Sequence, residues 1–122
     1  MPLTADQGPD GGSRLAADIS NAVGHLLHDY TGRGPTQARA IVDGDVICVV
    51  LRGGLTKAER RLTADGETDA VLVVRQRFQA VMRTGLVRAV EGLTLRRVIA
   101  FMSTNHLEPD VACEIFILDQ PV

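Results

Sequence analysis

The stretch that decides the fold is Tyr30–Thr56, YTGRGPTQARAIVDGDVICVVLRGGLT. It ends one helix, builds two strands and begins the next helix. Gly32 follows the last apolar position of the first helix and suits the left-handed residue just beyond a helix C-terminus. Pro35 then prevents the helix from resuming, because proline lacks the backbone N–H that a helix needs. The chain therefore turns sharply here into extended structure.

A hairpin follows this turn. Asp43-Gly44-Asp45 separates two runs rich in β-branched residues, 37–42 and 46–51, which is a strong signal for two antiparallel strands. Thr56 and Glu59 then stand three residues apart in the capping-box pattern, which predicts the start of a short helix. The stretch thus predicts the order helix, strand, strand, helix.

The flanking sequence extends this order. Apolar residues at helical spacing predict an amphipathic helix of about 17 residues that begins near Ser13; they are Ile19, Val23, Leu26, Leu27 and Tyr30. After the short helix, Asp65-Gly66 interrupts the pattern, and a long helix runs from Glu67 to about Gly92. Two more strands follow, at 97–103 and 111–118, joined by the polar turn 104–110. The resulting order of the main elements is αββαββ.

The two halves of the chain resemble one another. When the first half is laid over the second, the following pairs coincide: Thr31 with Thr94, Arg33 with Arg96, Asp45 with Asp110, and Cys48 with Cys113. We therefore predict an α+β fold of two αββ units that share one antiparallel four-stranded sheet, with the helices on one face. We place the apolar strands 46–51 and 111–118 in the centre of that sheet.

Both alternating sets of residues in these central strands are apolar, with Glu114 as the exception. A sheet with one face in water normally alternates apolar and polar residues. The predicted helices cover only one face, so the other needs a further layer. We predict that a homodimer supplies it, through the sheets or through exchanged helices; the alternative is a monomer with an apolar, partly covered face.

Composition limits the classes of function. The chain has 122 residues and a net charge of −2, which fits a single domain, 14–122, and argues against a nucleic-acid binder. Residues 1–13 are acidic and rich in Gly and Pro, and we interpret them as a disordered leader. The sequence shows no secretory signal and no segment long enough to span a membrane, so we expect a cytoplasmic protein. Cys48 and Cys113 lie in strands, where free cysteines are usually buried thiols.

Few residues suggest a chemical site. Arg33 and Thr36 lie in a Gly-rich turn whose N–H groups could hold an anion, although the Gly-Lys-Ser/Thr ending of a phosphate-binding P-loop is missing. His106 and Asp110 share the last turn with Glu108, and oxygen and nitrogen donors on a tight turn could hold an ion. No pattern marks a nucleophile, and we predict no catalytic residue, no metal and no cofactor.

Several motifs together resemble the MpsC-like family. They are Gly-Arg-Gly-Pro-Thr at 32–36, Arg-Gly-Gly-Leu-Thr-Lys-Ala-Glu at 52–59 and the run Val-Ile-Ala-Phe-Met-Ser-Thr-Asn-His-Leu-Glu-Pro-Asp at 98–110. The family is named for a sodium-translocating, membrane-potential-generating system. The resemblance implies a small soluble protein associated with membrane uptake of cations or inorganic carbon, and it carries no known catalytic residues. Among the matching positions, Arg33, Glu59 and His106 are the least explained by backbone geometry.

The sequence therefore favours a non-enzymatic accessory or regulatory module that acts by protein–protein contact, with a subunit of a membrane transport system as a possible partner. The candidate ligand or partner residues are Arg33, Thr36, Glu59, His106 and Asp110. One alternative is a sensor that binds a small ligand or an anion at the turn around Arg33. A weaker alternative is a metal-dependent enzyme that uses His25, His28 or His106.

Overall fold

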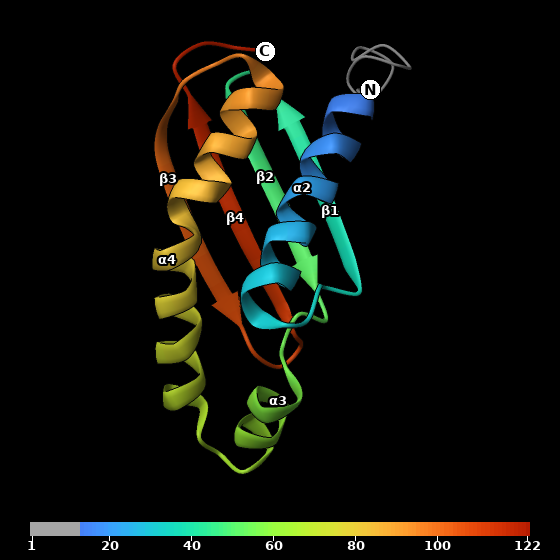
Figure 1. Cartoon of the computed structure of the whole chain (residues 1–122). Helices are drawn as coiled ribbons and strands as arrows, with labels where there is room; N and C mark the ends of the chain where they lie inside the picture. The colour runs from blue at the N-terminus through green and yellow to red at the C-terminus, as the bar shows by residue number, and fades with distance from the viewer. Residues whose placement is uncertain (1–12) are drawn as a thin grey trace.

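A computed structural model describes residues 13–122 of the chain (Figure 1). The predicted leader at 1–13 lies outside the described residues, apart from Ser13, where the first helix begins. In chain order the elements are α2 (Ser13–Thr31), β1 (Gln37–Asp43), β2 (Val46–Arg52), α3 (Lys57–Ala64), α4 (Thr68–Thr94), β3 (Val98–His106) and β4 (Val111–Leu118).

The four strands form one antiparallel sheet in the order β1-β2-β4-β3, with the two apolar strands in the centre. Helices α2 and α4 lie side by side on one face of this sheet, and α3 lies beyond its end (Figure 1). The predicted α+β fold of two αββ units is therefore confirmed, with α3 inserted between them.

The hydrophobic core lies between the sheet and the two long helices. Ile19 and Val23 of α2 and Leu86 of α4 are fully buried against Ile47 and Phe116 of the central strands. Burying an aliphatic or aromatic side chain of this size contributes about 1.5–3 kcal/mol relative to leaving it exposed. The core accounts for one face of the sheet only.

The internal repeat appears in the backbone hydrogen bonds. The N–H of Gly53 donates to the carbonyl of Asp110 at 3.1 Å, and the N–H of Leu118 donates to the carbonyl of Asp45 at 2.8 Å. Exchanging the two units exchanges these two bonds, because Gly53 is then replaced by Leu118 and Asp110 by Asp45. The same exchange maps the β2–β4 register onto itself, with Val49 opposite Glu114 at its centre. The two units are thus related by a pseudo-twofold axis through that central pair.

Three sequence predictions need correction. The long helix does not close at Gly92 but continues to Thr94, and Leu95 takes the left-handed cap position with φ 58°. The strand predicted at 97–103 continues to His106, so His106 belongs to β3 and the turn spans only 107–110. Tyr30, expected on the buried stripe of the first helix, is exposed because it lies in the last turn of α2, beyond the core.

The buried face of α4 also differs from the prediction. The sequence pattern placed Val74, Phe78 and Val81 toward the core, but Val74 and Val81 are exposed and Phe78 is only half-buried. The face turned inward carries Arg75 and Gln79 instead. In the first half of α4, Arg75 and Gln79 are therefore buried beside Val71, whereas Val73 and Val74 are exposed.

Candidate functional site

The face of the sheet opposite the helices is apolar, and no helix or strand among residues 13–122 covers it. Its central residues come from alternate positions of the two middle strands: Val46, Cys48 and Val50 from β2, and Val111, Cys113, Ile115 and Ile117 from β4. Ile41 and Met102 extend this face onto the edge strands, where they are 47% and 49% exposed. We call this surface the open face.

Polar residues surround the open face. Arg39 and Asp43 lie at one edge on β1, Thr104 and His106 lie at the other edge on β3, and Arg52 ends β2. An apolar centre inside a polar rim is the usual anatomy of a protein–protein interface. A contiguous apolar surface of this kind marks an interaction site in a soluble protein.

The two cysteines lie at the centre of the open face. The register places Cys48 opposite Ile115 and Cys113 opposite Val50, so the two thiols are diagonal neighbours on adjacent strands. Neither is fully buried in the single chain, contrary to the expectation for core thiols. Burial, followed by the nearby Cys113 thiol, raises the pKa of Cys48. Because the thiolate is the nucleophilic form, this thiol is unsuited to nucleophilic catalysis at neutral pH.

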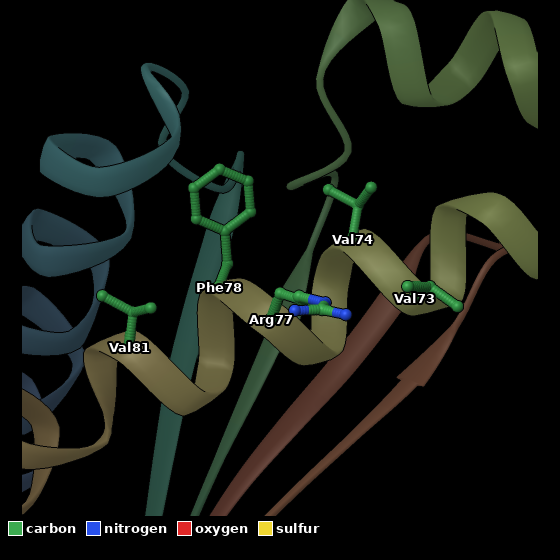
Figure 2. A pocket seen from close by; sticks show the side chains of 5 residues that line it. All are labelled: Val73, Val74, Arg77, Phe78 and Val81. Carbon is green, nitrogen blue, oxygen red and sulfur yellow. The ribbon is translucent and has the colours of Figure 1, made fainter.

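A second apolar surface lies on the helical side. It is a groove of about 260 Å³ lined by Val73, Val74, Arg77, Phe78 and Val81. All five side chains project from successive turns of α4, with Val74, Phe78 and Val81 on the same side of the helix (Figure 2). Val81 is 63% exposed, so this groove is open to solvent.

Three of the predicted site residues meet at one end of the sheet, around the loop that joins β2 to α3. Arg33 Nε donates to the carbonyl of Gly53 at 3.2 Å. Asp110 Oδ2 accepts from the N–H of Leu55 at 3.0 Å. Glu59 Oε1 accepts from the N–H of Thr56 at 2.8 Å, as the capping box requires. These side chains hold the loop in place.

The Gly-rich turn offers little room for an anion. The N–H of Arg33 donates to Thr31 Oγ1, and the N–H of Thr36 donates to the carbonyl of Arg52. The hydroxyl of Thr36 also donates to that carbonyl at 3.1 Å, and a Cβ on Gly53, where φ is 69°, would collide with the Thr36 side chain. The hollow lined by Arg33 and Asp110 measures only about 10 Å³. This junction is close-packed.

The histidines lie on two elements of the fold, α2 and the end of β3. His106 lies at the rim of the open face, with Nδ1 2.8 Å from the carbonyl of Pro109. His25 and His28 are exposed on α2, and His28 lies 3.9 Å from Asp29. Within the described part of the chain, no group of three or more His, Cys, Asp or Glu side chains is placed to hold a metal ion.

The internal repeat explains the role of Arg33. Arg96, its equivalent in the second unit, donates from Nε to the carbonyl of Pro121 at 2.9 Å, just as Arg33 donates to Gly53. Each arginine thus ties the end of its helix to the segment that follows the second strand of its own unit. The preceding threonines match too, because Thr31 and Thr94 each bond the carbonyl four residues earlier at 2.8 Å. Arg33 therefore has a structural role.

We expect Arg33→Ala to lower the free energy of unfolding by about 1–2 kcal/mol, since it removes a hydrogen bond from a charged donor. Arg96→Ala should cost less, because its contact is more exposed. Arg88→Ala, on the exposed side of α4, is the control and should stay within about 0.5 kcal/mol of wild type. Urea denaturation measures all three. Calorimetric binding of phosphate or bicarbonate that disappears in Arg33→Ala would contradict a purely structural role.

Sequence reasoning missed a buried polar cluster between α4 and the sheet. Glu114, on β4, is 1% exposed and accepts a hydrogen bond from the hydroxyl of Ser103. Gln79 and Asn105 exchange two amide hydrogen bonds of 3.0 Å. The only signal in the sequence was a single carboxylate inside a doubly apolar strand.

Arg75 joins this cluster to the α3 loop. Its guanidinium lies 3.4 Å from Glu59 Oε1, with both side chains about 7% exposed, and 3.4 Å from the carbonyl of Gly54. Burial raises the pKa of Glu114 to about 7, although Ser103, Arg75 and Gln79 each act to lower it. Oε2 of Glu59 and of Glu114 has no hydrogen-bond partner. A carboxyl group that titrates near neutral pH is thus enclosed in the fold.

Comparison with known protein families gives one match. The family model described as "Na+-translocating membrane potential-generating system (MpsC)" matches residues 12–120. Comparisons with curated proteins and with solved structures gave no match. No helix among residues 13–122 is both long and apolar enough to cross a membrane. Because the family match covers nearly the whole chain, the protein belongs to the MpsC family.

Proposed function

We propose that the protein is a non-enzymatic accessory or regulatory module that works in the cytoplasm as a homodimer and contacts a subunit of a membrane transport system. The observation that carries the proposal is the open face, an apolar surface with a polar rim on a sheet whose other face is already filled. A surface of this kind costs free energy in water and is stabilised by a second protein layer.

A second copy of the chain is the occupant that fits the open face best. The rim carries Arg39, Arg52 and Asp43, so an identical face meets charges of both signs rather than uniform repulsion. The pseudo-twofold axis gives the apolar residues a similar arrangement in both halves of the face. A twofold dimer uses the same surface patch on both subunits, so one open face can serve as the whole interface.

The size of the open face sets the expected strength of pairing. Four strands of about seven residues span roughly 20 by 23 Å, or about 450 Å² per copy. The total of about 900 Å² lies below the roughly 1,200 Å² at which stable specific interfaces begin, in the range of weak, transient complexes. We therefore expect a dissociation constant on the order of micromolar.

The transport partner is supported by the family description, which names a membrane-potential-generating system. Helix α4 lies on the side of the sheet opposite the open face (Figure 1), so the groove on α4 stays free when two sheets pair. It offers a partner protein an apolar contact surface that remains exposed in the dimer.

Affinity purification tests the transport association. Tagged protein is recovered from cells in a gentle detergent, in parallel with Val81→Glu, which places a charge in the α4 groove. We expect a membrane transport subunit to co-purify with wild type and to be depleted with the variant. Recovery of no such subunit with wild type would contradict the proposal.

A further inference from the structure

The two cysteines at the centre of the open face have a feature that dimerisation alone does not need. They are equivalents under the internal repeat, since laying the first unit over the second places Cys48 on Cys113. They lie on adjacent strands in diagonal positions, and the Cys113 thiol contributes to the raised pKa of Cys48. One chain therefore presents a pair of neighbouring sulfur ligands on an apolar surface.

This diagonal arrangement suits a metal ion better than a disulfide. Diagonal positions on paired strands have Cα atoms about 7–8 Å apart, whereas a disulfide requires Cα atoms closer than about 7 Å. Two thiolates on one Zn²⁺ ion, at Zn–S distances of about 2.3 Å, lie about 3.8 Å apart, which neighbouring side chains of this length can reach without moving the backbone.

A second copy completes the coordination. When two identical sheets stack about a twofold axis that lies between them, over the midpoint of the two cysteines and at about 45° to the line from Cys48 to Cys113, that line in one copy crosses its equivalent in the other at about a right angle. The four sulfur atoms of two such pairs, one above the other, then lie at the corners of a tetrahedron.

We propose that Cys48 and Cys113 of two copies together bind one tetrahedral divalent metal ion of the zinc type at the centre of the dimer. This inference rests on the proposed pairing of the open faces. Four sulfur ligands in tetrahedral geometry select Zn²⁺ or an iron–sulfur centre over harder ions. The bound ion replaces the protons of the thiols and ties together two faces whose apolar area alone gives only weak pairing.

Titration of the purified full-length protein with Co²⁺ tests the inference, because Co²⁺ bound to thiolates absorbs in the visible and near-ultraviolet. We expect the thiolate bands to saturate at one ion per two chains. They should be lost in Cys48→Ser and in Cys113→Ser, and kept in Val50→Ser, which alters a neighbouring residue of the same face. Zn²⁺ should lower the dissociation constant of the wild-type dimer at least about tenfold, as linkage requires of a ligand that binds only the dimer.

The outcomes separate this inference from the proposed function. A dimer that shows no thiolate bands with Co²⁺ overturns the metal site and leaves the pairing of the open faces intact. Saturation at one ion per chain, or bands that survive in both cysteine variants, also overturns it. A monomer at all concentrations, with or without Zn²⁺, contradicts the pairing itself.

Discussion

Glu114→Gln should remove most of the pH dependence of stability between pH 5 and pH 8. Between pH 5 and pH 8, the free energy of unfolding of the variant should rise by about 3 kcal/mol relative to that of wild type. The reason is that the folded protein holds the Glu114 proton to a pKa of about 7, against about 4.3 for an unperturbed glutamate. Glutamine keeps the shape of the side chain and stays neutral.

The sign follows from proton binding. Below the unfolded-state pKa both states bind the proton, and burial of neutral Glu114 carries no charge penalty. Between the two pKa values the folded protein binds more protons than the unfolded chain, so wild-type stability falls as the pH rises. Above pH 7 the ionised carboxylate is enclosed with one unpartnered oxygen, and the full penalty applies.

Chemical denaturation at pH 5, 6.5 and 8 measures this effect. Glu108→Gln, which neutralises an exposed carboxylate in the last hairpin, is the control and should leave the pH profile unchanged. The difference in unfolding free energy between wild type and Glu114→Gln should change from pH 5 to pH 8. If this difference is the same at both pH values, Glu114 does not titrate near pH 7 in the fold.

Ile115→Glu should raise the dissociation constant of the dimer at least about a hundredfold, or about 3 kcal/mol. Ile115 lies in the middle of the open face, opposite Cys48. A carboxylate there would lose its water when two faces stack, and an unpaired buried charge costs several kcal/mol. In the separate chain this position is only half-buried, so the fold itself should survive.

Val81→Glu is the matched control for this experiment, since it adds the same charge to an exposed apolar residue on the helical side. It should dimerise like wild type, with both variants checked by circular dichroism and sedimentation. If Val81→Glu dissociates the dimer and Ile115→Glu does not, the chains associate through α4 rather than through their sheets.

The sequence predicted most of the fold because it contains strong signals for turns and for the ends of helices. Gly32, Pro35 and Asp43-Gly44-Asp45 each restrict the backbone locally, and the observed turns follow them. The capping box of Thr56 and Glu59 is formed as predicted. The central position of β2 and β4 followed from strands that are apolar on both faces. Local signals were sufficient wherever the chain changes direction.

The sequence could not identify the inward face of α4. Apolar periodicity favours Val74 and Val81 as core residues, whereas Arg75 and Gln79 are buried by pairing with groups far away in the chain. The partners come from other elements, since Arg75 bonds a residue of α3 and Gln79 bonds a residue of β3. Hydrogen bonds between elements so far apart leave no periodic signal, so the polar cluster emerges only from the fold.

The same limit applies to Arg33 and His106. Both stood out because backbone geometry did not explain them, and a ligand was one interpretation. The structure gives Arg33 a carbonyl partner that its repeat equivalent, Arg96, also has, and it places His106 at the end of β3 on the rim of the open face. An unexplained side chain in a sequence can therefore serve a tertiary contact.

The mass of the protein in solution tests most directly whether the open face pairs with a second copy. Sedimentation equilibrium at about 100 μM, well above the micromolar dissociation constant that the interface size implies, should give twice the 13.1 kDa of one chain. Dilution should shift the mass toward that of one chain. A mass of 13.1 kDa at the highest concentration, with and without Zn²⁺, would contradict the pairing of the open faces.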